Sequence, residues 1–161
     1  MRIIIIEDDE NKLNHITDFI KNDYPGTQID IYNSYRSGLK AIFEDYEKTD
    51  LILLDMSMNT YNVTAYETGG RKRPFAGRDI LDQMKWNDIV APVVIVTAYE
   101  TFEEYGRKFT LAELCSEMEK SFLGLYLGCV YFDSSQRNWM DHLGSFIKQR
   151  NEDINAKNTN S

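Results

Sequence analysis

The chain has 161 residues, of which 42% are apolar and 27% charged, and its formal net charge is −8. These values are ordinary for one globular domain with a single core. The negative charge argues against direct nucleic-acid binding, because a phosphate backbone would repel the protein. No apolar run approaches the roughly 20 residues that a membrane span needs, and the short apolar start leads directly into acidic residues. We therefore expect a cytoplasmic protein without a membrane anchor.

The first third of the chain alternates strand-like and helix-like segments. Residues 2–6 are a β-branched run without alternation, which is typical of a strand buried on both faces. An amphipathic helix is predicted next, with Asp8 or Asp9 as its cap. A weaker strand over 28–32, a second amphipathic helix and a third strand over 51–54 follow.

The alternation of strand-like and helix-like segments is interrupted in the middle of the chain. Residues 56–76 are polar, show neither a helix nor a strand period and predict a long loop, and loops of this length are often functional. A helix over about 77–86 and a strand over 92–96 follow. Residues 99–123 carry aromatic and aliphatic side chains at helix-like spacing, and they predict one long helix or two shorter ones.

The end of the chain predicts one further strand and one further helix. The strand covers 129–132, the helix covers about 136–149, and the polar residues 151–161 are expected to form a disordered tail. Cys115 and Cys129 have no metal-binding spacing. In a cytosolic protein we expect them to be two small buried or half-buried thiols.

Five alternations of strand and helix predict an α/β fold, a doubly wound five-stranded parallel sheet with helices on both faces. We expect one domain over residues 1–150, enlarged at 56–76 and at 98–127. In open α/β sheets the ligand site lies beyond the carboxyl ends of the strands. The candidate functional residues are therefore those at which strands stop.

Acidic residues and one hydroxyl stand at three strand ends. Glu7 and Asp8 follow the first strand, Asp55 follows the third and Thr97 ends the fourth. Neighbouring parallel strands lie about 4.8 Å apart, so these side chains gather if the three strands are adjacent. Clustered carboxylates need a cation, and oxygen ligands suit Mg²⁺ or Mn²⁺. Each acid alone is more simply explained as a helix cap, but the combination indicates a pocket in which Asp55 can attack a phosphoryl group.

At these positions the sequence resembles the response-regulator receiver family of two-component signalling. The resemblance extends from residue 2 to about residue 149, and it implies a flavodoxin-like, receiver-type fold. The segments that carry it are 3–10 (IIIIEDDE), 51–56 (LILLDM), 77–81 (GRDIL) and 93–98 (VVIVTA).

The resemblance implies a role for each matching residue. Asp55 would be the phospho-acceptor and Thr97 the switch hydroxyl that moves toward the phosphate. Tyr131, placed at the start of the fifth strand, would be the aromatic residue that rotates inward with Thr97. The implied metal ligands are Glu7, Asp8, Asp55 and the backbone carbonyl of Ser57.

The chain departs from the family pattern in three places. The family has a lysine just after the fifth strand, where this sequence has serines at 134–135. The intervals after Asp55 and after Thr97 are both longer than usual. The basic run 71–73 in the first of them is one candidate replacement for the lysine, and a solvated basic turn is the alternative.

We favour a stand-alone phospho-accepting receiver of a two-component or phosphorelay pathway. A histidine kinase or phosphotransfer protein would phosphorylate Asp55 with Mg²⁺, and the signal would pass to a downstream protein effector. The sequence is also compatible with a homodimer. The protein would not be an enzyme beyond self-catalysed phosphoryl transfer and hydrolysis. The alternative is a phosphorylation-independent pseudo-receiver that acts as an interaction module, which the missing lysine favours. A metal-dependent phosphohydrolase is a weaker third interpretation, because Ser57 stands where such enzymes need a second acid.

Overall fold

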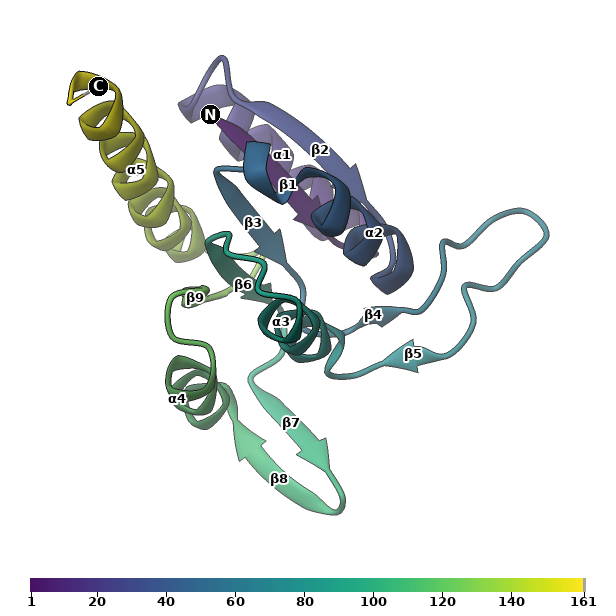
Figure 1. Cartoon of the computed structure of the whole chain (residues 1–161). Helices are drawn as coiled ribbons and strands as arrows, with labels where there is room; N and C mark the ends of the chain where they lie inside the picture. The colour runs from purple at the N-terminus through teal and green to yellow at the C-terminus, as the bar shows by residue number, and fades with distance from the viewer. Residues whose placement is uncertain (161) are drawn as a thin grey trace.

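The computed structural model describes residues 1–160, and its centre is a five-stranded parallel sheet (Figure 1). The strands lie in the order β2-β1-β3-β6-β9, with every neighbouring pair parallel. The predicted α/β class is confirmed, and β1, β3 and β6 are adjacent. The strands are β1 (Arg2–Ile6), β2 (Gln28–Tyr32), β3 (Leu51–Leu54), β6 (Val93–Thr97) and β9 (Tyr126–Tyr131).

Helices cover both faces of this sheet. One face packs on α1 and α5, and the other packs on α2, α3 and α4. A short 3-10 helix (Tyr46–Lys48) links α2 to β3. The α-helices are α1 (Glu10–Asp23), α2 (Tyr35–Asp45), α3 (Ala76–Trp86), α4 (Leu111–Ser121) and α5 (Asn138–Thr159).

The two covered faces explain why the first strand has no polar alternation. Ile4 and Ile6 point into the core beneath α2, α3 and α4, while Ile3 and Ile5 point into the core beneath α1 and α5. All four side chains are buried. Each buried side chain of this kind contributes about 1.5–3 kcal/mol relative to exposure. The strand is therefore fixed from both sides, and its carboxyl end is held in one position.

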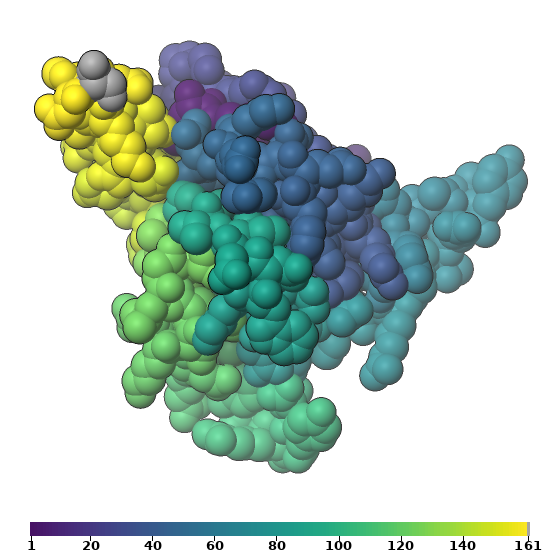
Figure 2. Space-filling view, in the orientation of Figure 1, coloured from purple at the N-terminus to yellow at the C-terminus, as the bar shows by residue number. Residues whose placement is uncertain are grey.

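The long segment after β3 is a two-stranded ribbon, which we call the arm (residues 57–74). Its strands β4 (Met58–Asn59) and β5 (Lys72–Arg73) pair in antiparallel orientation. The Thr60 and Tyr61 amides donate to carbonyls of the returning strand, which extends the pairing. The arm projects from the body of the molecule (Figure 2). The segment that we expected to be a long loop is therefore a ribbon ordered by its own backbone hydrogen bonds.

The expected helix over 99–123 is wrong in its first half. Residues 101–110 form a hairpin of β7 (Thr101–Glu104) and β8 (Arg107–Thr110), and only α4 is helical. Tyr105 and Gly106, the two residues of the turn, both have positive φ, which is what a tight hairpin turn requires. Phe102 and Phe109 are cross-strand partners, so their spacing imitated a helical stripe.

The last helix is longer than expected. It continues through residues 151–159, so the prediction of a disordered tail is wrong there, and Ser161 lies outside the described residues. Arg150 contributes to the order, because it donates to the Asp50 carbonyl at 3.0 Å and pairs with Asp153 at 3.1 Å. Across residues 1–160, no helix has the length and apolar character required to cross a membrane.

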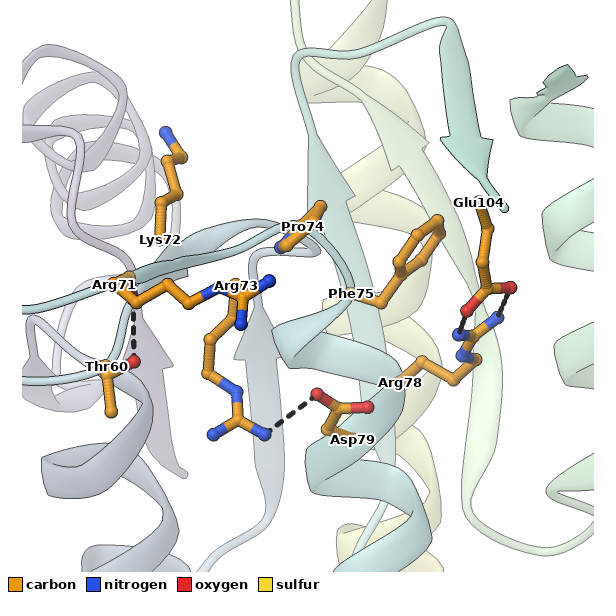
Figure 3. Close-up of a pocket in the computed structure, with 9 residues that line it drawn as sticks. All are labelled: Thr60, Arg71, Lys72, Arg73, Pro74, Phe75, Arg78, Asp79 and Glu104. Carbon is orange, nitrogen blue, oxygen red and sulfur yellow. Dashed lines mark hydrogen bonds and ion pairs between the residues drawn. The ribbon is translucent and has the colours of Figure 1, made fainter. Parts of the chain in front are cut away.

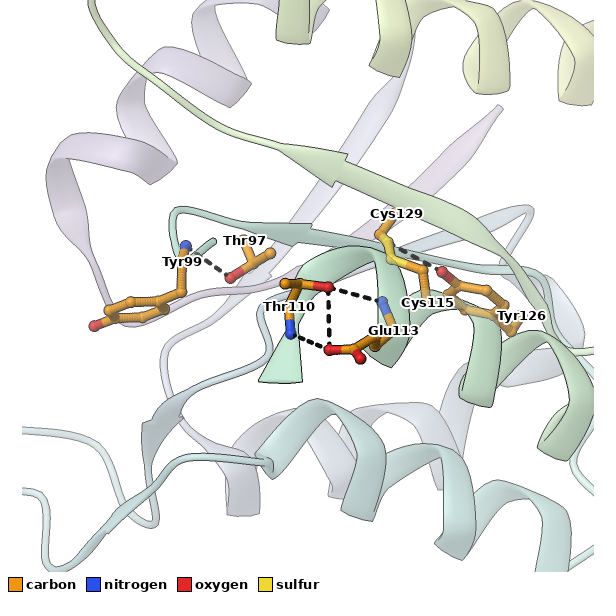
Figure 4. Close-up of a disulfide and its surroundings, with 7 residues drawn as sticks. All are labelled: Thr97, Tyr99, Thr110, Glu113, Cys115, Tyr126 and Cys129. Atoms are coloured by element: carbon orange, nitrogen blue, oxygen red, sulfur yellow. Dashed lines mark hydrogen bonds between the residues drawn. A yellow bond between two sulfur atoms is a disulfide. The ribbon is translucent and has the colours of Figure 1, made fainter. Parts of the chain in front are cut away.

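The cysteines differ from the expectation of two free thiols. Cys115 of α4 and Cys129 of β9 are joined in a disulfide, with their Cα atoms 6.5 Å apart (Figure 4). Both residues are half-buried. Their spacing of 14 residues gave no sign of pairing, because it is the packing of α4 on β9 that brings the two sulfurs together.

Candidate functional site

The acidic residues at the ends of β1 and β3 form one cluster. The strands are in register at Ile6 and Leu54, and the Asp55 amide donates to the Ile6 carbonyl at 3.0 Å. One carboxylate oxygen from each of Glu7, Asp8 and Asp55 lies within 4.8 Å of the others. Glu7 is 2% exposed and Asp55 5% exposed. The structure therefore brings together the three acids that we expected to meet.

A lysine that we did not predict lies inside this cluster. The Lys12 ammonium is 2.8 Å from Oδ1 of Asp55 and 2.6 Å from Oε2 of Glu7. It also donates to the Val96 carbonyl at 2.5 Å, at the end of β6. Lys12 is itself only 2% exposed. One ammonium thus connects the carboxyl ends of β1, β3 and β6.

The position of Lys12 follows from the start of α1. Asp9 caps the helix by accepting the Lys12 amide, which fixes Lys12 in the first turn. Ile16 lies one turn later on the buried face of the same helix. A signal was present in the sequence, because Lys12 stands four residues before Ile16 and therefore on the apolar stripe. We considered only the segment after β9 and the basic run 71–73 as sources of a cation.

Burial and charge act in opposite directions on the protonation of this cluster. Burial raises the pKa of Glu7 to about 8, against the attraction of the Lys12 ammonium. Burial also raises the pKa of Asp55, although Lys12 and the Met56 amide oppose the rise. Burial alone would lower the pKa of Lys12, but its attraction to Asp55 and Glu7 outweighs that effect and the pKa is raised. The ammonium is therefore charged at neutral pH.

The two oxygens of Asp55 have different surroundings. Oδ1 accepts from the Lys12 ammonium and from the Met56 amide, both at 2.8 Å, whereas Oδ2 accepts neither bond. Gly77 at the start of α3 allows close packing here, because a Cβ at this position would lie 2.7 Å from the Asp55 carbonyl oxygen. Both of these hydrogen bonds thus hold the same oxygen of Asp55.

Asp8 connects the cluster to the arm. Its Oδ2 accepts the Asn59 amide at 2.9 Å, and Asn59 belongs to β4. Asp8 is half-buried, unlike the fully buried Glu7 and Asp55. Ser57, two residues after Asp55 and the first residue of the arm, is also buried. Asp8 is therefore the most exposed of the three acids.

Thr97 and Tyr131 lie beside this cluster on the next two strands. Thr97 is fully buried at the end of β6, and its hydroxyl accepts the Tyr99 amide at 3.2 Å (Figure 4). Tyr131 is paired with Thr97 across the sheet. We had expected it at the start of the fifth strand, but it is the last residue of β9. Its side chain is 38% exposed. In this conformation the ring faces outward.

The basic residues of the arm have other neighbours. Arg73 pairs with Asp79 of α3 at 3.2 Å, and its guanidinium lies 3.9 Å from the centre of the Tyr35 ring. Arg71 and Lys72 line a pocket beside α3. The cation next to Asp55 is therefore Lys12, and the hypothesis that the run 71–73 supplies it is not supported.

Comparison with known proteins found relatives over most of the chain. No family model matches the chain. The Detocs response regulatory protein DtcB of Enterobacter cloacae (strain JD6301) is 28% identical over 144 residues, which cover 89% of this chain and 95% of that protein. An uncharacterized protein, y4jR, of Sinorhizobium fredii (strain NBRC 101917 / NGR234) is 26% identical over 142 residues, which cover 86% of this chain and 91% of that protein.

Solved receiver structures share the fold. The response regulator TrrA of Thermotoga maritima, in complex with Mg²⁺ and BeF, is 17% identical with a TM-score of 0.59, covering 92% of this chain and 97% of that one. The Mn²⁺-bound form of the response regulator Rcp1 is 18% identical with a TM-score of 0.54, covering 88% and 87%. The chain has the flavodoxin-like fold of response-regulator receiver domains, and the resemblance inferred from its sequence is confirmed.

Proposed function

We propose that this chain is a phospho-accepting receiver of a two-component or phosphorelay pathway, phosphorylated on Asp55 with the help of Mg²⁺. The observation that carries the proposal is the Asp55 carboxylate itself. It stands at the end of β3 with one oxygen held by Lys12 and with Glu7 and Asp8 beside it. Receiver domains in general are signalling modules and not conventional enzymes, and we propose at most self-catalysed transfer and hydrolysis here.

The donor set fits a hard divalent cation. Glu7, Asp8 and Asp55 offer only oxygen atoms, within the separation that one ion can span. With the backbone carbonyl of Ser57 they would hold Mg²⁺ or Mn²⁺. A metal bound there would neutralise charge on the transferred phosphoryl group. Asp8 is half-buried and is therefore the most accessible of the three carboxylates to such an ion.

The chain's own residues would do the rest of the transfer. An oxygen of Asp55 would attack the phosphorus of the donor, a new O–P bond would form, and the donor's bond to phosphorus would break with its electron pair leaving on the donor. The Lys12 ammonium would stay between Asp55 and Glu7 and offset the negative charge that accumulates. Lys12 would in this way serve where the usual lysine after β9 is absent.

The signal would pass through Thr97 and Tyr131. A phosphoryl group on Asp55 would compete with the Tyr99 amide for the Thr97 hydroxyl. The outward-facing ring of Tyr131, paired with Thr97 in the sheet, could then turn inward. We propose a histidine kinase or phosphotransfer protein as the donor and a protein effector as the receiver of the signal.

A second function is favoured by one observation. The Lys12 ammonium already offsets part of the negative charge of the acidic cluster in the absence of a metal ion. A pseudo-receiver that acts only as an interaction module would have this property. The two functions differ in whether Asp55 can still take a phosphoryl group.

The deciding experiment is labelling of Asp55. The protein is incubated with Mg²⁺ and acetyl phosphate, and the mass of the intact chain is measured. We expect the mass of one added phosphoryl group, lost in Asp55→Asn and retained in the control Asp141→Asn, which is an exposed position on α5. Beryllofluoride with Mg²⁺ should shift the NMR signals of Thr97 and Tyr131. No labelling and no shift would favour the pseudo-receiver.

A further inference from the structure

A second polar pocket lies away from the acidic cluster, where the arm meets the body of the molecule. It has a volume of about 330 Å³, which is within the range of small-ligand sites. Its walls come from three elements: the arm, the start of α3 and the end of β7. The lining residues are Thr60, Arg71, Lys72, Arg73, Pro74, Phe75, Arg78, Asp79 and Glu104 (Figure 3).

The charge of this pocket is opposite to that of the chain. Its lining has four cations and two carboxylates, a balance of 4 − 2 = +2, whereas the whole chain carries −8. The two carboxylates are already paired. Glu104 holds Arg78 through two hydrogen bonds of 2.5 and 3.1 Å, and Asp79 holds Arg73 at 3.2 Å. The excess positive charge therefore belongs to Arg71 and Lys72.

Arg71 and Lys72 have no carboxylate partner within ion-pair distance in residues 1–160. The Arg71 backbone is fixed, because its carbonyl accepts both the amide and the hydroxyl of Thr60. Figure 3 shows the Arg71 side chain extended along the ribbon toward Arg73 and Pro74, while Lys72 points away from them. Arg71 is thus the unpaired guanidinium that is directed into the pocket.

The neighbouring arginines are held in place by aromatic rings. The guanidinium of Arg78 lies 4.4 Å from the centre of the Phe75 ring, and that of Arg73 lies 3.9 Å from the centre of the Tyr35 ring. Held guanidinium groups lose little freedom when an anion binds, and their planar donors match the oxygens of a phosphate group. The pocket therefore has the features of a prepared phosphate site.

We propose that this pocket binds a small phosphate-bearing molecule, a phosphate monoester or a diphosphate, with Arg71 as its main contact. Both enlarged segments of the chain build the pocket, since the arm supplies Arg71 and the β7–β8 hairpin supplies Glu104. Thr60 follows Asn59, whose amide binds Asp8. A ligand here would therefore lie next to the part of the arm that contacts the acidic cluster.

The test uses the whole chain and inorganic pyrophosphate, without Mg²⁺, at low ionic strength. We expect saturable binding by calorimetry and NMR shifts centred on Thr60, Arg73 and Arg78. Arg71→Gln should weaken the binding by about tenfold or more, as loss of a charge-assisted bidentate contact does. Lys40→Gln makes the same change of charge at an exposed site on α2 and should leave the affinity unchanged.

Three results would overturn the proposal: no saturable binding at millimolar pyrophosphate, an equal loss in Arg71→Gln and Lys40→Gln, or displacement by a hexaglutamate peptide at similar concentration. The last would mean that the pocket binds acidic protein segments and not phosphate groups. Asp55→Asn should bind pyrophosphate normally. The outcome is thus independent of whether Asp55 is phosphorylated.

Discussion

At the scale of single residues, the arrangement around Lys12 determines the chemistry of the site. Two buried carboxylates share one buried ammonium, and Asp8 remains at the more open edge. A buried charge is tolerated only when it is paired, so each member of this group depends on the others. The serines at 134–135 show that the cation has not been kept at its usual place in the family. The ammonium that lies next to Asp55 is that of Lys12, near the start of the chain.

Replacing Lys12 with methionine should damage both stability and labelling. Removal of one partner from a buried ionic group costs about 3 kcal/mol, and we expect that loss in urea unfolding at pH 8. The loss of unfolding free energy should be smaller at pH 6, because Glu7 and Asp55 can take up protons there and no longer need a cation beside them. Labelling of Asp55, measured at pH 6, should fall by about tenfold or more. Lys21→Met, in the exposed last turn of α1, is the control. Normal labelling in Lys12→Met would contradict the role given to this ammonium.

The raised pKa of Glu7 predicts how stability depends on pH in metal-free buffer. The folded protein holds a proton on Glu7 up to about pH 8, whereas the unfolded chain releases it near pH 4.5. The stabilisation from this group is therefore complete below pH 4.5 and is lost as the pH rises to about 8. The pKa of Asp55 is also raised by burial, so its contribution to stability is likewise lost as the pH rises. In the Glu7→Gln variant, the decrease in the free energy of unfolding between pH 5 and 8 should be clearly smaller than in the wild-type protein. An identical slope in both proteins would show that Glu7 does not titrate in this way.

At the scale of elements, the chain differs from a plain receiver through two hairpins and a disulfide. The arm lies between β3 and α3, and the β7–β8 hairpin lies between β6 and α4. Arg78 of α3 joins the second hairpin to the body through Glu104. Thr110 ends β8 and at once caps α4 through a reciprocal pair of hydrogen bonds with Glu113 (Figure 4). The hairpin therefore determines where α4 begins.

Reduction of the Cys115–Cys129 bond should lower the free energy of unfolding. A closed loop of about 15 residues gives a stabilisation of about 3 kcal/mol, and the spacing here is 14 residues. Urea unfolding with and without reductant measures the difference. The double variant Cys115→Ser and Cys129→Ser should match the reduced protein and should not respond to reductant. Equal stability of oxidised and reduced wild-type protein would show that the bond adds nothing to the packing of α4 on β9.

At the scale of the whole molecule, two hydrophobic cores hold the sheet from both sides. The core beneath α1 and α5 and the core beneath α2, α3 and α4 share the five strands. The acidic cluster lies at the carboxyl edge of this sheet, so a ligand bound there contacts residues from β1, β3 and α1 together. Binding at this edge should therefore stabilise the protein as a unit.

Magnesium should raise the global stability by mass action. At a free concentration 100 times the dissociation constant, the gain is about 2.7 kcal/mol, and thermal or urea unfolding would report it. Asp8→Asn should lose most of this gain, because it removes the most accessible of the three ligands. Asp18→Asn, an exposed change on α1, should keep it. Equal stabilisation of both variants would indicate that the ion binds somewhere else.

From the sequence we could predict the α/β class, a first strand covered on both faces, and the gathering of Glu7, Asp8 and Asp55 if the first, third and fourth strands are adjacent. These depend on local patterns, since a continuous apolar run predicts a strand covered on both sides and the parallel arrangement places all carboxyl ends on one edge. The order of the strands, the contacts of the Lys12 ammonium and the pairing of the cysteines became known only from the three-dimensional structure. Each of these depends on which segments distant in the sequence come into contact, and the local pattern of residues does not specify those contacts.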